Sequence, residues 1–210
     1  MVSLKNKRLW LVMVLIIFSL SMTSLLSWAA NSNDASNYFP MKTSNKWHYK
    51  VTLNDKTSYD QIIQVGEPKD GQLRLIVVIN GTPQVEIDYI QKETGLFKTR
   101  EVSKDSTIVM EPLQMVLSAK LNIGNNWKWQ STNGKMQEKT KVIKKEQIKV
   151  PAGKFEAILI ECEGVDAQGQ AYKDQAWYAK GIGIVKDIYT ANDGKSISQE
   201  LVEHKLSSRK

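Results

Sequence analysis

Aromatic side chains gather in three short segments of the chain, and their shapes suit them to hold a ligand. Trp47 and Tyr49 alternate in the first segment and Trp127 and Trp129 in the second, so on a strand each pair shares one face. Such rings can line a concave surface for an acyl chain or stack on sugar rings. As core residues they would instead fix strand register, and we favour that interpretation for most of them. The candidates for ligand binding are Trp47, Tyr49, Trp127, Trp129, Trp177 and Tyr178.

Residues with catalytic chemistry are few and poorly spaced. A Ser or Cys nucleophile would need a histidine partner, and the only histidines are His48 and His204. Neither lies at metal-ligand spacing from another His, Cys or Asp. Glu161, Glu163 and Asp174 could form an acid pair across adjacent strands, as in a glycosidase, but solvent-facing strand positions explain them more simply. We therefore expect no enzyme activity, no catalytic residue, no metal site and no cofactor.

Two further features are better explained by structure than by chemistry. Gly181-Ile182-Gly183 lacks the Gly-Lys-Ser/Thr sequence and the following helix of a phosphate loop, which favours a tight turn. Cys162, the single cysteine, shares an alternating face with Ile158 and Ile160. It is expected to be a small buried residue rather than a reactive thiol, and no intramolecular disulfide can form.

The N-terminus is typical of an exported protein. Lys5, Lys7 and Arg8 precede an apolar run over residues 9–20, and Ser27 and Ala29 are small residues at a cleavage site. Residues 1–29 are thus predicted to be a secretory signal peptide, and residues 30–37 a polar linker. An uncleaved anchor is the alternative, because residues 9–26 could barely span a bilayer. Either way the protein is expected to be extracytoplasmic, and to touch a membrane only through an uncleaved signal segment.

Charge argues against nucleic acid as a partner. The chain has 29 Lys and Arg against 22 Asp and Glu, and three of the basic residues lie in the predicted signal peptide. The remaining charges are interspersed apart from a lysine cluster over residues 139–149, which a solvated strand face explains. Attraction to an anionic cell surface stays open.

The rest of the chain predicts one antiparallel β domain over residues 38–210. About 180 residues suffice for a single core. Short alternating runs separated by turn residues, such as Asn80-Gly81, indicate about ten or eleven strands joined by short connections. Residues 107–121 are predicted to form a strand followed by one short helix beginning at Pro112. Residues 136–148 are predicted to form a charged, exposed strand of the kind that protects a sheet edge.

Two pairs of segments suggest an internal duplication. Residues 44–49 are similar to residues 124–129, and residues 89–98 to residues 177–186. Both pairs occur in the same order, although aromatic and glycine residues recur in any β meander. The predicted pseudo-repeats span residues 39–102 and 121–188.

Three motifs carry a resemblance to a known group of proteins. Phe39-Pro40 before Asn45-Lys46-Trp47-His48-Tyr49, then residues 150–155 (VPAGKF), then residues 177–186 (WYAKGIGIVK) resemble a family of exported bacterial all-β proteins of unassigned function. Lys180 departs from the proline that is frequent there, and Thr43-Ser44 from Val-Gly. The resemblance implies a curved antiparallel sheet or half-barrel, similar in fold to periplasmic lipoprotein carriers. It brings no catalytic residue.

Three functions follow as hypotheses. The first is a non-enzymatic exported protein whose concave sheet face binds an apolar or amphipathic ligand such as a lipid, or a cell-envelope partner. The second is a structural or interaction module of the cell envelope with a filled core. The third is a carbohydrate-binding module or weak glycosidase. A roomy apolar cavity would favour the first, a solid core the second, and an exposed aromatic row beside paired carboxylates the third.

Overall fold

A computed structural model describes residues 35–207 of the chain. The predicted signal peptide and most of the predicted linker lie outside the described residues. Contacts between residues divide the chain into residues 1–32 and residues 33–210. Everything below concerns the second unit by itself.

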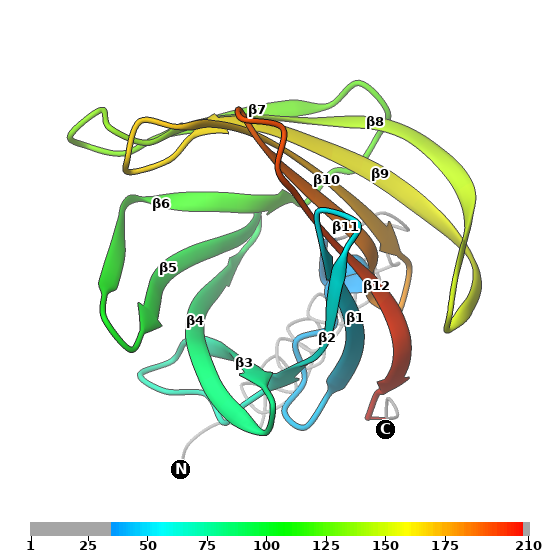
Figure 1. Ribbon diagram of the computed structural model, residues 1–210. Helices are drawn as coiled ribbons and strands as arrows, with labels where there is room; N and C mark the ends of the chain where they lie inside the picture. Colours follow the sequence, from blue (N-terminus) through cyan, green and yellow to red (C-terminus); the bar gives the residue numbers. More distant parts are fainter. Residues whose placement is uncertain (1–34, 208–210) are drawn as a thin grey trace, which may run out of the picture. The chain divides into compact units, whose positions relative to one another are not determined.

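One short helix and twelve strands make up this unit (Figure 1). They are α2 (Ala35–Tyr38), β1 (Lys46–Leu53), β2 (Thr57–Val65), β3 (Leu73–Ile79), β4 (Thr82–Lys92), β5 (Gly95–Ser103), β6 (Thr107–Ser118), β7 (Asn126–Gln130), β8 (Gln137–Val150), β9 (Gly153–Val165), β10 (Ala171–Ala179), β11 (Gly183–Ala191) and β12 (Ser196–Lys205).

All twelve strands belong to one antiparallel sheet that curls into a nearly closed barrel. The strand order is β6-β5-β4-β3-β2-β1-β12-β11-β10-β9-β8-β7. Strands that follow one another in sequence pair with each other except β6 and β7, which are the two ends of the sheet, and β1 also pairs with β12. Figure 1 looks into the barrel, with β4 to β6 facing β8 to β12 across the interior. The all-β antiparallel prediction is confirmed. The predicted half-barrel of about ten strands is wrong in strand number and in the degree of closure.

Side chains close the barrel where its two end strands meet. The indole N–H of Trp127 donates to the Met115 carbonyl oxygen at 3.0 Å, and that of Trp129 donates to the Pro112 carbonyl oxygen at 2.7 Å. A backbone bond from Thr132 to Glu111, 2.7 Å long, continues this contact beyond the end of β7. We call the junction of β6 and β7 the seam. The two indoles supply hydrogen bonds where the rest of the sheet has a backbone ladder.

The helix predicted at Pro112 is wrong, because β6 continues through this residue. The Glu111–Pro112 peptide bond is cis. The pairing of β5 with β6 also shifts register between Lys98 and Arg100, opposite this part of β6. Proline lacks an N–H and is tolerated at bulges and on end strands. Pro112 lies both at a bulge and on an end strand.

The predicted edge strand over residues 136–148 corresponds to β8, which pairs with β9 along its length but with β7 only over residues 137–141. The first part of β8 is therefore not a sheet edge, and the short β7 is the end strand there. The second part, with the exposed Lys144, Lys145 and Lys149, has a ladder partner on one side among the described residues, as the edge prediction expected.

One end of the barrel is covered by the segment before β1. Ala35 and Tyr38 of α2 are buried, although residues 35–37 fall in the predicted linker. Gly181 in the β10–β11 turn donates its backbone N–H to the Asn37 carbonyl oxygen. The buried side chain of Asn45 donates to the Pro40 carbonyl oxygen at 2.7 Å. These bonds hold Phe39 at this covered end of the barrel, where its ring faces the interior.

The strand order places the two similar segment pairs at matching positions. Trp47 is the second residue of β1 and Trp127 is the second residue of β7. Residues 89–98 cross the β4–β5 turn and residues 177–186 cross the β10–β11 turn. The duplication itself stays a prediction, and its two copies, residues 39–102 and 121–188, would correspond to β1–β5 and β7–β11.

Candidate functional site

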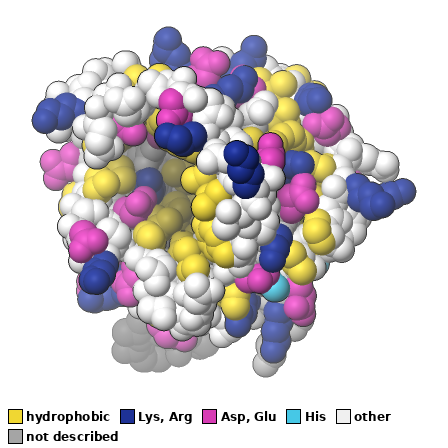
Figure 2. All heavy atoms as spheres, viewed as in Figure 1, with side chains coloured by type: hydrophobic (Ala, Val, Ile, Leu, Met, Phe, Trp, Pro, Cys, Tyr) yellow, Lys and Arg dark blue, Asp and Glu magenta, His cyan; other side chains and the backbone are white. Residues whose placement is uncertain are grey.

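The interior of the barrel holds a cavity of about 240 Å³. Figure 2, in the same view as Figure 1, shows a hollow on this face with hydrophobic side chains inside it and charged side chains around it. Strands β4, β5 and β6 supply one wall and β8 to β11 the other. A second cavity of about 200 Å³ adjoins it and shares Lys98, Gln114, Glu138 and Tyr172. We call these two connected spaces the lumen.

Part of the lumen is apolar. Its base is aromatic, since the ring of Phe39 lies 5.9 Å from that of Tyr89 and 6.4 Å from that of Tyr178. Aliphatic side chains from five strands continue this surface. They are Leu96, Val116, Leu117, Ile160, Ala176 and Ile184. This surface could bury the hydrocarbon part of a ligand.

The opposite part of the lumen is polar and centres on Glu138. One carboxylate oxygen of Glu138 accepts from the Gln114 side-chain amide at 2.6 Å and from the Tyr172 hydroxyl at 2.5 Å. Three strands thus meet at one atom, because Gln114 lies on β6, Glu138 on β8 and Tyr172 on β10. The contact from Gln114 to Glu138 also crosses the seam.

Gly164 makes the contact between Tyr172 and Glu138 geometrically feasible. It pairs with Glu138 on one side and with Tyr172 on the other. A Cβ atom at Gly164 would lie 2.6 Å from the Tyr172 ring. The Tyr172 side chain therefore reaches from β10 across β9 to Glu138 on β8, and it passes over Gly164, which has no side chain to block it. The ring is held on its other side by Tyr189, with ring centroids 5.4 Å apart.

Two carboxyl groups, Asp174 and Asp187, lie against each other in the lumen wall. Burial raises the pKa of Asp174 to about 6, although a hydrogen bond with Asp187 acts to lower it. Burial, and then the charge of Asp174, raise the pKa of Asp187 well above its ordinary value. Burial and mutual repulsion therefore favour a proton shared by the pair, which allows the hydrogen bond between the two carboxyl groups.

Cys162 lies on the same inner surface, opposite Thr140 on β8 and Asp174 on β10. Burial raises the pKa of its thiol to about 12. A thiol that stays protonated is a poor nucleophile. This agrees with the sequence-based expectation of a small structural residue.

The first two aromatic candidates belong to the core. The Trp47 indole donates to the Ile182 carbonyl oxygen at 2.6 Å, and the Tyr49 hydroxyl donates to the Ile184 carbonyl oxygen at 2.8 Å. Both side chains are almost fully buried. They tie β1 to the β10–β11 hairpin. Gly181 and Gly183 have φ values of +77° and +107°, so this hairpin needs glycine's freedom, as the tight-turn interpretation expected.

The other four candidates divide between seam, surface and lumen. Trp127 and Trp129 donate across the seam. Trp177 donates to a Glu146 carboxylate oxygen at 2.9 Å and faces away from Tyr178, as adjacent strand residues must. Of the six, Tyr178 lines the 240 Å³ cavity. Trp129 also lines the smaller cavity of the lumen. The structure thus distributes the six residues among core, seam, surface and lumen and does not gather them into one aromatic platform.

The suggested acid pair divides between the two faces of the sheet. Glu161 pairs with Lys173 at 2.8 Å on the outer face, and Glu163 is exposed there. Asp174 faces the lumen. In residues 35–207, no group of three or more His, Cys, Asp and Glu side chains is arranged to hold a metal. No helix in that range is long and apolar enough to cross a membrane.

Sequence reasoning missed most of the polar lumen residues. Alternation along β10 does place Tyr172, Asp174 and Tyr178 on one face, and that signal was available. Gln114 and Glu138 come together only through closure of the seam. Asp187 could not be placed, because the pairing of β10 with β11 shifts register between Trp177 and Tyr178.

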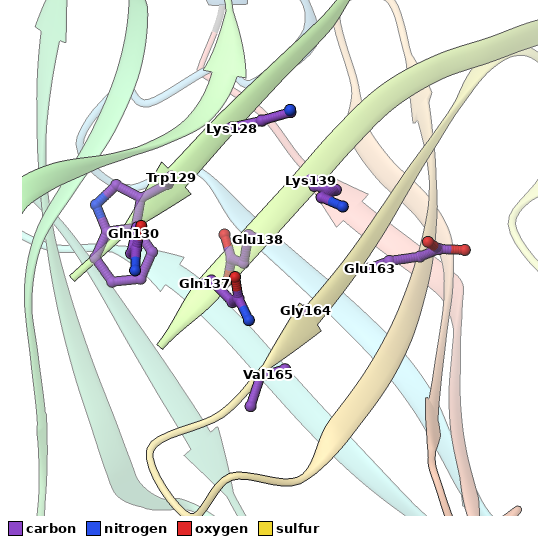
Figure 3. A pocket seen from close by; sticks show the side chains of 9 residues that line it. All are labelled: Lys128, Trp129, Gln130, Gln137, Glu138, Lys139, Glu163, Gly164 and Val165. Atoms are coloured by element: carbon purple, nitrogen blue, oxygen red, sulfur yellow. The ribbon is translucent and has the colours of Figure 1, made fainter. Parts of the chain in front are cut away.

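A wider pocket of about 420 Å³ lies beside the ends of β7, β8 and β9 (Figure 3). Its rim consists mainly of exposed polar and charged side chains, which are Lys128, Gln130, Gln137, Lys139 and Glu163. This pocket is more open to solvent than the lumen, so a ligand there would stay largely hydrated. The smaller lumen is the better candidate for an apolar or amphipathic ligand.

Comparison with known proteins gives a partial family match. The model of the DUF3108-like family matches residues 110–202, which is less than half of the chain and includes the VPAGKF and WYAKGIGIVK motifs. No curated protein matches the chain.

Several solved structures are similar to the chain. A protein from Bacteroides fragilis described as exported, with a YmcC-like fold, is 12% identical, with 80% of this chain and 99% of that chain covered and a TM-score of 0.47. A protein from Parabacteroides distasonis described as a lipoprotein is 15% identical, with 82% and 100% covered and a TM-score of 0.48. A LolA superfamily protein from Nitrosomonas europaea is 10% identical, with 85% and 92% covered and a TM-score of 0.36. These TM-scores are low, so function is argued below from the lumen itself.

Proposed function

We propose that this protein is a non-enzymatic, extracytoplasmic binding protein that holds a small apolar or amphipathic ligand in the lumen of its barrel. The observation that carries the proposal is the cavity of about 240 Å³ with an aliphatic surface on one part and hydrogen-bonding groups on the other. Export is supported by the signal-peptide pattern of residues 1–29.

An envelope module with a filled core would have closely packed side chains here. Protein interiors are packed to the density of organic crystals, with few voids larger than a water molecule. The cavity of about 240 Å³ alone is smaller than a usual ligand site, roughly 300–1,000 Å³, but together with the adjoining space of about 200 Å³ it reaches that range. The cavity therefore favours ligand binding over a purely structural role.

The carbohydrate alternative has less support. Trp47, Trp127 and Trp129 direct their indole N–H groups to backbone carbonyl oxygens and do not present a flat row of rings. Glu161 is ion-paired with Lys173, on the opposite face of the sheet from Asp174. The predicted pair of Glu161 and Asp174 therefore does not face one site, as two carboxyl groups must in glycoside hydrolysis.

The proposal is tested by filling the lumen. Ala176 lines the cavity and is 6% exposed, so Ala176→Leu places a larger side chain where the ligand would lie. The control is Ala171→Leu, the same substitution at an exposed residue of the same strand. Native mass spectrometry of protein purified from its host would reveal a co-purifying small molecule. Calorimetric titration with decan-1-ol would measure binding directly.

We expect the wild-type protein and Ala171→Leu to bind decan-1-ol alike, and Ala176→Leu to bind at least tenfold more weakly while remaining folded by circular dichroism. Wild-type protein that carries no small molecule and shows no saturable binding would overturn the proposal. So would equal affinity in all three proteins.

A further inference from the structure

Gln114 has a buried hydrogen-bond acceptor that nothing in the fold satisfies. The residue is 6% exposed, and its Oε1 atom has no hydrogen-bond partner among residues 35–207. Gln114 lines both cavities of the lumen. A buried acceptor without a donor costs about 1–3 kcal/mol, so this position favours a bound group that donates a hydrogen bond.

The orientation of the Gln114 amide is fixed by chemistry. Its partner is a Glu138 carboxylate oxygen at 2.6 Å, and a carboxylate only accepts. The NH₂ group of Gln114 must therefore face Glu138, and the amide oxygen is the atom left without a donor. The Tyr172 hydroxyl also donates to Glu138, so the side-chain donors nearest this point are already engaged.

The charge of the lumen is negative. Glu138 and Asp174 line it, and Asp174 is largely ionised at pH 7.5 because its pKa is raised only to about 6. The single lysine in the lining, Lys98, lies 3.2 Å from the Glu101 carboxylate. An anionic head group would meet like charge in a poorly hydrated space, whereas an ammonium group would be attracted.

Size limits the ligand as well. At roughly 30 Å³ per heavy atom, the volume of a water molecule in the liquid, the larger cavity accepts about eight heavy atoms and the whole lumen about fifteen. That is room for one chain of moderate length. A lipid with two long acyl chains would not fit inside.

We propose, on the basis of the proposed ligand-binding function, that the lumen selects a single-chain amphiphile whose head group donates hydrogen bonds and carries no negative charge. The head, an ammonium or a hydroxyl group, lies at Gln114 and Glu138, and the chain lies along the aliphatic surface that includes Leu96, Leu117 and Ile184. The ammonium head is preferred because Glu138 is charged.

Three probes with the same chain and different heads test the inference on the full-length exported protein. Decylamine, decan-1-ol and decanoate are titrated by calorimetry at pH 7.5, below their aggregation thresholds. We expect decylamine to bind most tightly, decan-1-ol next, and decanoate at least tenfold more weakly than decylamine. Decanoate binding as tightly as decylamine would overturn the inference and leave the proposed function standing. Binding of none of the three would overturn the proposed function.

Two variants in the lumen and one control variant test which side chains cause the preference for one head group over another. Glu138→Gln removes the charge, so decylamine should lose its advantage over decan-1-ol. Gln114→Met removes the free acceptor at similar volume, so decylamine and decan-1-ol should both bind about tenfold more weakly. Glu163→Gln removes a carboxylate from the exposed outer face of β9 and should change nothing. The inference is contradicted if folded Glu138→Gln keeps the decylamine advantage, or if folded Gln114→Met binds decylamine and decan-1-ol as tightly as wild type. If one variant fails to fold, the other still decides it.

Discussion

The indole N–H of Trp129 lies 2.7 Å from the carbonyl oxygen of Pro112, and this bond joins the two end strands of the sheet. Trp127 makes the same kind of contact with Met115 at 3.0 Å. An open strand edge exposes unpaired backbone groups and invites pairing with other chains. At the seam, side chains satisfy two of these carbonyl oxygens while leaving the strands without a full ladder. The seam is therefore the weakest junction between strands of the barrel.

We predict that Trp129→Phe loosens the seam. Phenylalanine keeps most of the buried ring but cannot donate to Pro112, and losing one hydrogen bond to a buried carbonyl costs about 1–3 kcal/mol. Amide hydrogen exchange measured by mass spectrometry should accelerate in peptides from β6 and β7 and remain unchanged in β1 and β2. Trp177→Phe is the control, because it removes an indole bond to Glu146 away from the seam. Equal acceleration in both variants would contradict a special role for the seam.

Gly164 gives a second test, this time of the polar part of the lumen. A methyl group at this position would collide with the Tyr172 ring, since the added Cβ would lie 2.6 Å from it. Gly164→Ala should therefore displace Tyr172 from Glu138 and destabilise the fold by about 1–3 kcal/mol, the usual cost of overpacking.

Tyr172→Phe separates the two effects of that displacement, because it keeps the ring and removes only the hydroxyl that bonds to Glu138. Urea unfolding should show a smaller loss for Tyr172→Phe, about 1 kcal/mol, than for Gly164→Ala. A Gly164→Ala protein as stable as wild type would show that the tyrosine does not cross β9 as described.

Much of the fold can be predicted from alternation, and the exceptions have identifiable physical causes. Trp47 and Tyr49 share a buried face as alternation requires. The closure of the barrel cannot be predicted from local sequence patterns. It depends on a hydrogen bond from Trp129 to a carbonyl oxygen of a strand that does not pair with its own strand. Pro112 suggested a helix start in the sequence, yet it is accommodated in an irregular end strand.

The candidate site was harder to predict than the fold. Its central contact joins Gln114 to Glu138 across the seam, and no sequence pattern links these residues. Asp187 shares the lumen with Ile184 only because the register shift in β11 changes which residues face inward. Bulges and barrel closure are decided by tertiary packing, so period-two patterns cannot reveal them.

The paired carboxyl groups predict an unusual pH dependence of stability. The pKa values of Asp174 and Asp187 are raised in the fold, chiefly by burial, whereas an unfolded aspartate titrates near roughly 3.9. The folded protein therefore binds more protons than the unfolded chain above about pH 4, and the free energy of unfolding falls as pH rises through 6 and beyond. The slope can reach about 1.4 kcal/mol per pH unit for each linked proton.

Asp187→Asn should flatten this dependence. Asparagine can still donate to Asp174 but has no proton to lose, so the advantage of the variant over wild type should grow from pH 6 to pH 8 in urea unfolding. The control is Asp193→Asn, at an exposed aspartate whose pKa is lowered by Lys195 and which is ionised in both states across this range. Parallel curves for wild type and Asp187→Asn would refute the assignment of the pair.

The outer wall of the barrel contains a buried ion cluster that should matter for stability alone. Asp88 is 4% exposed and accepts hydrogen bonds from Arg74 at 2.8 Å and from Arg100 at 2.6 Å. Burial acts to raise the pKa of Asp88, but the bonds from the two arginines hold it below its ordinary value. Asp88→Asn leaves two guanidinium groups without their shared anion, which should cost about 3–5 kcal/mol.

The matched control for Asp88 is Asp60→Asn, at an exposed aspartate that contacts His48 at 2.9 Å on the surface. Its urea midpoint should stay close to that of wild type, because exposed ion pairs contribute little. Binding of decan-1-ol by the folded fraction of Asp88→Asn should be unchanged, since the Asp88 cluster lies outside the lumen. Loss of binding in folded Asp88→Asn protein would mean that the outer wall and the lumen are coupled, contrary to this separation.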